Sequence, residues 1–168
     1  MALTKITGQG LGTLKTLAGS TTFNIDSAGH VTKPLQPAFL VHPASDQTNM
    51  ANDATLVFGT EIYDQNADFA SNTFTAPVTG KYLMCIAARV DQIDTNATWV
   101  RIEMTTSNRG YSTSLIDPHG DNEYTSIDFS IIVDMDASDT CYLRWGFSGG
   151  SATADLIDAT RWSGALIC

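Results

Sequence analysis

Residues 74–85, FTAPVTGKYLMC, combine a turn with a densely apolar strand. Pro77 and Gly80 are typical of the turn that precedes a strand. Apolar residues then fill both alternating sets of positions: Tyr82, Met84 and Ile86 form one set, and Leu83, Cys85 and Ala87 form the other. Because alternate residues of a strand point to opposite faces of its sheet, we expect both faces to be covered. One face would fill the core of a sandwich, and the other would meet a neighbouring subunit or a second layer.

Strand patterns recur through the chain after residue 36. Eight segments carry them, at 37–42, 55–64, 80–90, 97–107, 110–117, 123–135, 140–149 and 159–168. The clearest alternation lies in 126–134, where every second residue from Ile127 to Val133 is apolar and Ile132 alone breaks the pattern. Short turns rich in Asn, Asp, Gly and Pro separate the segments. This spacing predicts an all-β sandwich or barrel of antiparallel strands.

The size and the cysteine content fit one globular domain without disulfides. The chain has 168 residues, of which 43% are apolar, enough to build a full core. Its three cysteines, Cys85, Cys141 and Cys168, are odd in number and have no CxxC spacing, which argues against both a disulfide framework and a zinc site. We therefore expect buried free thiols in a protein made in a reducing compartment.

The charge balance disfavours two classes of partner. Eighteen acidic residues face nine basic ones, which gives a formal net charge of −9. Because phosphate groups are bound by clustered Lys and Arg, which are scattered here, we expect neither a nucleic acid nor an anionic membrane as a partner. No segment approaches the roughly 20 apolar residues that span a bilayer. The N-terminal residues are too often interrupted by Thr and Gly to form a signal-peptide core, so export by a cleaved signal is not expected.

The first 36 residues differ from the rest of the chain. They are rich in Gly and Thr and contain only sparse apolar anchors, so they cannot build a core of their own. A free segment of this composition should be disordered unless a partner or a symmetry mate orders it. The sequence therefore predicts an extended N-terminal arm over 1–36, ordered by a partner or a symmetry mate, and a head domain over 37–168.

The sequence matches the known patterns of catalytic residues poorly. The segment FSGGSA, at 147–152, lacks the G-x-S-x-G turn that exposes a nucleophilic serine. His30, His42 and His119 lie in loop-like or strand-edge settings, where surface histidines are usual. The Gly-rich stretch 8–12 follows no hydrophobic strand, so it does not indicate a phosphate-binding loop. We predict that the protein is not an enzyme and carries no cofactor.

Two acidic turns could hold calcium. Residues 64–68, DQNAD, match the start of a calcium loop, but Phe69 stands where the loop needs Gly and Thr75 where it needs Glu. The turn that begins at Asp117 offers Asp121 and Glu123 and matches no template. A solvated acidic turn is the simpler interpretation of both, and a structural calcium near Asp64 or Asp117 is the alternative.

Three motifs in order resemble the globular head of complement-type collagenous proteins. The first is Phe74, Pro77, Gly80 and Tyr82 within 57–90, and the second is the apolar strand, acidic turn and aromatic strand of 126–150. The third is the closing strand with Trp162, Gly164, Leu166 and Ile167. The resemblance covers about residues 37–168. It implies a ten-stranded jelly roll related to tumour necrosis factor, assembled as a homotrimer, although no Gly-X-Y collagen stalk is present.

A second resemblance precedes the head. Residues 23–41, FNIDSAGHVTKPLQPAFLV, are similar to a passage that bacteriophage fibre and virion-surface proteins carry before such a head. The matching positions are Ile25, Asp26, Ser27, Gly29, Val31, Thr32, Pro34, Gln36, Pro37 and Phe39. This resemblance implies a phage structural protein that is made in the bacterial cytoplasm and resides on the virion.

The leading hypothesis is a homotrimeric, non-enzymatic protein on the surface of a phage particle, which decorates the capsid. A tail-fibre or spike tip that binds a host surface glycan or protein is the first alternative. The 168 residues contain no long shaft before the head, which favours decoration. A soluble lectin-like trimer is the second alternative, and the absence of an export signal disfavours it.

Two sets of residues follow from this hypothesis. The arm would be anchored, to capsid or tail proteins or to the trimer itself, by Ile6, Leu11, Leu14, Leu17, Phe23 and Ile25. The family motifs would supply core or trimer positions at Phe39, Phe58, Tyr63, Phe74, Gly80, Tyr82, Phe129, Trp145, Trp162 and Gly164.

Overall fold

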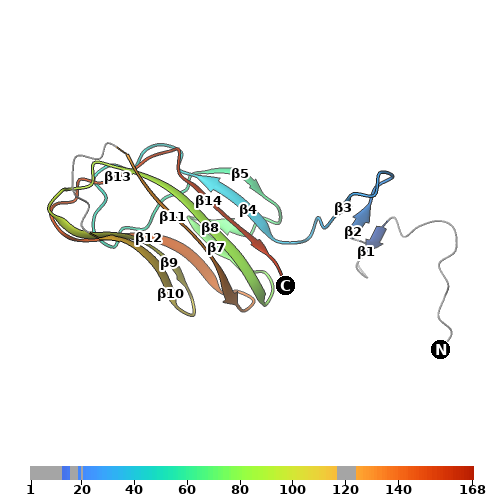
Figure 1. The fold of residues 1–168 in the computed structure, drawn as a ribbon. Coiled ribbons are helices and arrows are strands. Elements are labelled where there is room, and N and C mark those ends of the chain that lie inside the picture. The colour runs from blue at the N-terminus through green and yellow to red at the C-terminus, as the bar shows by residue number, and fades with distance from the viewer. Residues whose placement is uncertain (1–12, 16–18, 20, 117–123) are drawn as a thin grey trace, which may run out of the picture. The chain divides into compact units, whose positions relative to one another are not determined.

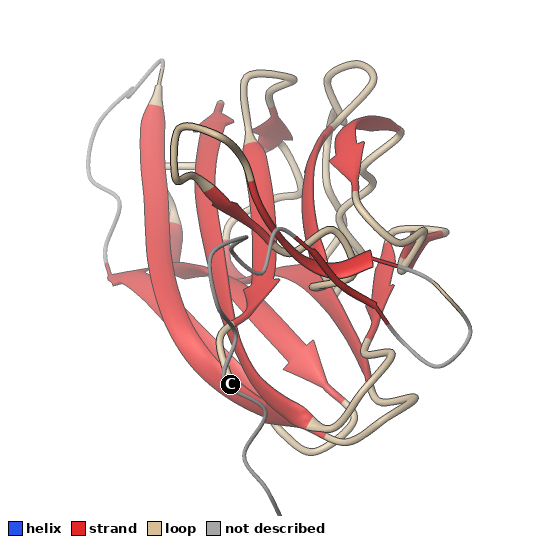
Figure 2. Cartoon of the chain, turned by 90° about the vertical axis from the view of Figure 1, so that its right-hand side faces the viewer, coloured by secondary structure: helices blue, strands red, loops and turns tan. Residues whose placement is uncertain are grey.

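The computed structural model describes residues 13–15, 19, 21–116 and 124–168. The chain divides into two compact units, residues 1–36 and 37–168. Every element in the described part is a strand, as Figure 2 shows. No helix in that part could therefore cross a membrane.

The N-terminal unit contains a small antiparallel sheet. Its order is β1 (Thr13–Lys15), β2 (Thr21–Ile25) and β3 (Val31–Thr32). Strands β2 and β3 differ from the prediction of a simply extended arm, because a tight turn at Asp26 folds the chain back between them. Gly29 adopts a positive φ of 89° in this turn, a conformation that glycine reaches without steric cost.

The head is a sandwich of two antiparallel sheets (Figure 1). The first sheet, the β8 sheet, has the order β11-β8-β14-β4-β5, with β13 paired to β8. Its strands are β4 (Ala38–His42), β5 (Thr60–Asp64), β8 (Gly80–Asp91), β11 (Thr125–Met135), β13 (Asp155–Leu156) and β14 (Arg161–Leu166). The second sheet, the β9 sheet, has the order β10-β9-β12-β7-β6. Its strands are β6 (Phe69–Ala70), β7 (Thr73–Thr75), β9 (Ala97–Thr106), β10 (Gly110–Ile116) and β12 (Thr140–Gly149).

This architecture confirms the predicted all-β antiparallel sandwich. The predicted strand at 55–64 is shorter in the structure, because only Thr60–Asp64 joins a ladder. The residues before it cross to the other sheet, where the Leu56 N–H donates to the Leu143 carbonyl at 2.9 Å and Thr55 bridges to Arg144. The short strands β6, β7 and β13 were not predicted, since two or three residues are too few for a readable alternation.

Aromatic rings dominate the core between the two sheets. Phe39 lies at their centre, with its ring centroid 5.0 Å from that of Phe74 and 5.3 Å from that of Phe69. The edge of Trp162 meets Phe39 at 5.2 Å. Each of these side chains is at most 5% exposed, and burial of one such ring contributes roughly 1.5–3 kcal/mol. The cluster joins the β8 sheet, through β4 and β14, to the β9 sheet, through β6 and β7.

Candidate functional site

The outer face of the β8 sheet carries a strip of apolar side chains. The backbone register sets Ile132, Leu83, Ala165 and Ala38 in one row across β11, β8, β14 and β4. The next row is Ser130, Cys85, Ser163, Leu40 and Tyr63. Residues directly opposite each other in a ladder share a face, so these two rows form one continuous surface. We call it the apolar face.

Several large side chains of the apolar face are exposed in the single chain. Ile132 is 56% exposed, Tyr63 is 48% exposed and Leu83 is 38% exposed. The intervening residues on the other side of the same strands are buried, as Tyr82 and Met84 at 0% exposure show. The strand β8 therefore has apolar residues on both faces, with only one of them covered by the second sheet.

Charged residues bound the apolar face along the strands. At one end, Lys81 lies opposite Asp134. At the other end, Ala87 pairs with Asp128 of β11 on one side and with Arg161 of β14 on the other. A hydrogen bond from its own backbone N–H, aided by the charge of Arg109, lowers the pKa of Asp134. An apolar centre with a charged margin is the usual anatomy of a protein–protein interface.

A second apolar surface lies at the edge of the sandwich where β10 and β11 run beside each other. Tyr111, Phe129 and Ile131 pack against the core there and are only half-buried, because β11 and β10 are the last strands of their sheets. The Tyr111 hydroxyl reaches Asp134 Oδ1 at 3.4 Å, and burial raises the pKa of Tyr111. We call this surface the β10–β11 edge.

The family-motif residues occupy two kinds of position. Phe39, Phe58, Phe74, Tyr82, Trp145, Trp162 and Gly164 are buried between the sheets. Gly80 begins β8, Phe129 belongs to the β10–β11 edge, and Tyr63 belongs to the apolar face. Leu40 and Ala165 of the apolar face were not singled out from the sequence. Ile132 was visible there only as the residue that broke the alternation of its strand.

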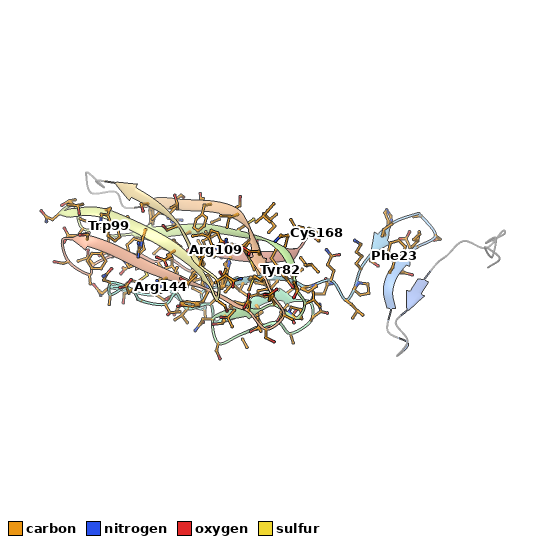
Figure 3. All side chains as sticks on the ribbon, turned by 90° about the horizontal axis from the view of Figure 1, so that it is seen from below. Phe23, Tyr82, Trp99, Arg109, Arg144 and Cys168 are labelled. Atoms are coloured by element: carbon orange, nitrogen blue, oxygen red, sulfur yellow. The ribbon has the colours of Figure 1, made fainter. Side chains whose placement is uncertain are left out.

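The predicted arm anchors are only partly within the described residues. Ile6, Leu11 and Leu17 lie outside them. Leu14 is in β1, where the register pairs it with Phe23 of β2, and Ile25 ends β2. Phe23 projects from β2 in Figure 3. Phe23 and Ile25 are both half-buried.

The Asp64 turn is held by hydrogen bonds within the protein. The Asp64 carboxylate accepts the backbone N–H groups of Asp68 at 3.1 Å and of Phe69 at 2.9 Å. Burial, and secondarily the charge of Asp64, raises the pKa of Asp68. The second proposed calcium turn, with Asp117, Asp121 and Glu123, lies outside the described residues, as does His119. In the part that the structure describes, no group of three or more His, Cys, Asp or Glu could hold a metal ion.

Charged side chains on the outer face of the β9 sheet pair with one another. The Glu103 carboxylate accepts from Arg101 Nη2 at 2.9 Å and from Arg144 Nη2 at 2.8 Å. Hydrogen bonding to Glu103 raises the pKa of Arg144. Figure 3 shows Arg144 and Trp99 on this side of the head. The arrangement stabilises the sheet surface and contains no nucleophile or proton donor poised for reaction.

A cavity of about 330 Å³ opens where β8 begins and β11 ends. Its lining includes Lys81, Asn108, Asp134, Asp136 and Cys168. Most of its polar groups bond within the protein, as Asn108 Nδ2 does to the Asp134 carbonyl at 3.1 Å, and Thr79 Oγ1 to Asp136 Oδ1 at 3.4 Å. These bonds shape two turns, and we assign no ligand to the cavity.

The comparison with known families agrees with the fold of the head. A sequence model described as the C1q domain matches residues 38–167. The chain belongs to the C1q domain family. Its match begins at the first residue of β4 and extends past the end of β14, so it spans both sheets of the head.

Solved structures with the same fold share little sequence with this C1q-domain protein. The globular domain of the zebrafish complement 1qA protein is 18% identical, with a TM-score of 0.60 over 79% of this chain and 98% of that one. Murine APRIL at pH 8.5 is 10% identical, with a TM-score of 0.56, and at pH 5.0 it is 9% identical, with a TM-score of 0.55. Each APRIL comparison covers 79% of this chain and 99% of that one. No curated protein matches the chain.

The family assignment sets the class of function for this C1q-domain protein. Domains of the C1q and tumour necrosis factor type are not enzymes, which confirms that prediction. They typically form homotrimers and act as binding modules. An exposed apolar face and a half-buried apolar edge are the features of this chain that such an assembly would bury.

Proposed function

We propose that the protein is a homotrimeric structural module on the surface of a bacteriophage particle, where it decorates the capsid. The observation that supports the assembly is the apolar face. Ile132, Leu83 and Tyr63 are exposed on it, and their strands β11, β8 and β5 extend from one edge of the sheet to the other. Soluble monomers rarely leave so continuous an apolar surface in water.

The geometry supports a heterologous contact. The apolar face and the β10–β11 edge are different surfaces of one chain, so the edge of one copy can pack on the face of the next. Such head-to-tail contacts close into a ring when the rotation between copies is suitable. Three copies are the number typical of the family. Each copy then buries its face against one neighbour and its edge against the other.

The particle role is supported by the sequence passage at residues 23–41, which resembles phage virion-surface proteins. The acidic net charge of −9 and the paired charges on the β9 sheet fit a surface that stays in solvent. Attachment would then fall to the N-terminal unit. Binding of a host glycan or protein by the head is the alternative role for the same trimer.

The assembly is tested by placing a charge on the apolar face. We expect Leu83→Asp to convert a trimer into a folded monomer, because an unpaired carboxylate would be buried at the contact. Val57→Asp is the matched control, since Val57 is 46% exposed and lies outside the β8 sheet. Mass photometry gives the copy number, and circular dichroism shows that the strands are retained. A wild-type protein that is monomeric at working concentrations contradicts the proposal.

The particle role is tested by locating the protein. A virion density map should show trimers of this head on the capsid surface, with a copy number set by capsid symmetry. Purified protein should leave phage adsorption to host cells unchanged. Competition by the purified protein for adsorption, or density at the tail, would instead favour the receptor-binding alternative.

A further inference from the structure

The small sheet of the N-terminal unit has one apolar face and one polar face. Ile25 pairs with Val31 across β2 and β3, and Phe23 lies two residues before Ile25 on the same side of β2. Asn24 points to the opposite side and pairs with Thr32. The three side chains Phe23, Ile25 and Val31 therefore share a face, which we call the arm face.

Among the described residues of the unit, no side chain buries the arm face completely. Val31 is 53% exposed, Phe23 and Ile25 are half-buried, and none of the described side chains from Gly19 to Leu35 is buried. The strands contain three, five and two residues. Sheets of this size do not hold together in water without packing against something else.

The turn between β2 and β3 is nevertheless specific. Asp26 Oδ1 accepts the backbone N–H groups of Ala28 and His30, each at 2.9 Å, and Asp26 Oδ2 lies 2.8 Å from His30 Nδ1. The Asp26 N–H donates to the His30 carbonyl at 3.0 Å. These bonds fix the hairpin and its register, and thereby hold Ile25 and Val31 on one side.

We propose that the arm face of each chain packs against the arm faces of the two other copies in the trimer, so that three arms share a second, small apolar core. This inference rests on the proposed trimer of heads. The connection from β3 to β4 is residues 33–37. Five residues span at most roughly 18 Å, so the arms of one trimer stay close together. Short tethers of this kind give effective concentrations in the millimolar range, which favours contacts between copies.

The connection also joins the arm to the β8 sheet itself. β4 starts at Ala38, which pairs with Ala165 in the same row as Leu83 and Ile132 of the apolar face. In a trimer formed through that face, three β4 strands begin at equivalent places around one axis. Each arm therefore has the two other arms of its trimer within reach of its tether, whereas a particle protein would have to be encountered by diffusion.

Cysteine cross-linking in the full chain tests this arrangement. Val31→Cys places a thiol on the arm face, and Thr32→Cys places one on its polar side as a matched control. Both are made with Cys168→Ser, which removes an exposed thiol, and the Cys168→Ser protein alone gives the background from Cys85. We expect mild oxidation to link V31C chains into covalent dimers at least about tenfold faster than T32C chains, because a disulfide needs Cα atoms within about 7 Å.

The outcomes separate the two proposals. If the protein is trimeric and V31C links no faster than T32C, the arm inference is overturned while the trimer of heads stands. If V31C chains form no dimers but cross-link to another protein on assembled particles, that protein covers the arm face instead, which also overturns the inference. A monomeric wild-type protein overturns both. Adding Leu83→Asp to V31C should abolish cross-linking, since it separates the heads.

Hydrogen exchange provides a second readout that does not depend on cysteine. Phe23→Asp should speed amide exchange in β2 and β3 at least about tenfold while the head stays trimeric, because opening of the sheet then costs less. Asn24→Asp, on the polar side of the same strand, should leave exchange nearly unchanged. Equal acceleration by both substitutions would show that the arm face is not buried between copies.

Discussion

Gly164 of β14 lies so close to Phe39 of β4 that a Cβ at residue 164 would come within 2.6 Å of Phe39 Cε1. The two residues are paired in the register of the β8 sheet, and Gly164 is also paired with Met84 of β8. The missing side chain leaves room for the Phe39 ring, which stacks on Phe69 and Phe74. This glycine therefore allows the aromatic cluster to lie directly against the sheet backbone.

Gly164→Ala should destabilise the head by about 1–3 kcal/mol, because the added methyl group overpacks the site between Phe39 and Met84. Thermal or urea unfolding measures the loss. The control is Ser163→Ala, one residue earlier and on the opposite face of β14. An alanine at 164 that left the unfolding midpoint unchanged would show that the Phe39 ring can move aside without cost.

Tyr82→Phe should destabilise the head by about 1 kcal/mol, the usual net value of one hydrogen bond. The Tyr82 ring is buried, and its hydroxyl donates to the Val78 carbonyl at 2.7 Å. This hydrogen bond links the turn before β8 to the strand. Tyr142→Phe is the matched control on the outer face of β12. Urea unfolding at neutral pH compares the two, and an equal effect of both substitutions would contradict a special role for the Val78 bond.

The alternation of residues predicted the strands and their buried faces well. In β8 both sets of positions are apolar, and the structure separates them into a buried set with Tyr82 and Met84 and an outer set with Leu83 and Cys85. Sequence alone could not assign the two sets, because alternation identifies a pair of faces and not their neighbours. The assignment needs the second sheet, which is built from residues far away in the chain.

The apolar face could be predicted only in part for the same reason. Leu83 stood out within one strand, but Leu40 and Ala165 join it only through the ladders β14–β4 and β14–β8. Such pairings join distant segments, and no local pattern records them. In the arm, composition was the misleading signal, because its Gly-rich residues suggested an extended segment. Asp26 stood out only as part of the resemblance to phage virion-surface proteins and not as the residue that holds a turn.

Asp68→Asn should stabilise the head at neutral pH and lose this advantage in acid. Burial, followed by the charge of Asp64, raises the pKa of Asp68 above its ordinary value of 3.8. The folded protein therefore binds more protons than the unfolded chain between pH 3.8 and the raised value, so stability falls as the pH rises through that window and stays lower above it.

Urea unfolding of the Asp68→Asn protein and the wild type, at pH 7 and below pH 4, measures this difference. Asp158→Asn removes an exposed carboxylate and reports the effect of losing one charge elsewhere. An advantage of Asp68→Asn that persisted unchanged in acid would have to come from something other than ionisation, and would refute the explanation by burial.

The three cysteines should react with a thiol reagent at three different rates. Cys141 is buried in the core, and burial raises the pKa of its thiol from 9.0 to about 12, so it should stay unreactive at pH 8 until the head unfolds. Cys168 is exposed and should react at once.

Cys85 lies on the apolar face and is half-buried in the single chain, so a trimer formed through that face should protect it. In the Leu83→Asp protein, Cys85 should react at least about tenfold faster than in the wild type, whereas Cys141 should be unaffected. Cys85→Ser identifies its signal, and a Cys85 that reacted equally fast in both proteins would place the subunit contact elsewhere on the head.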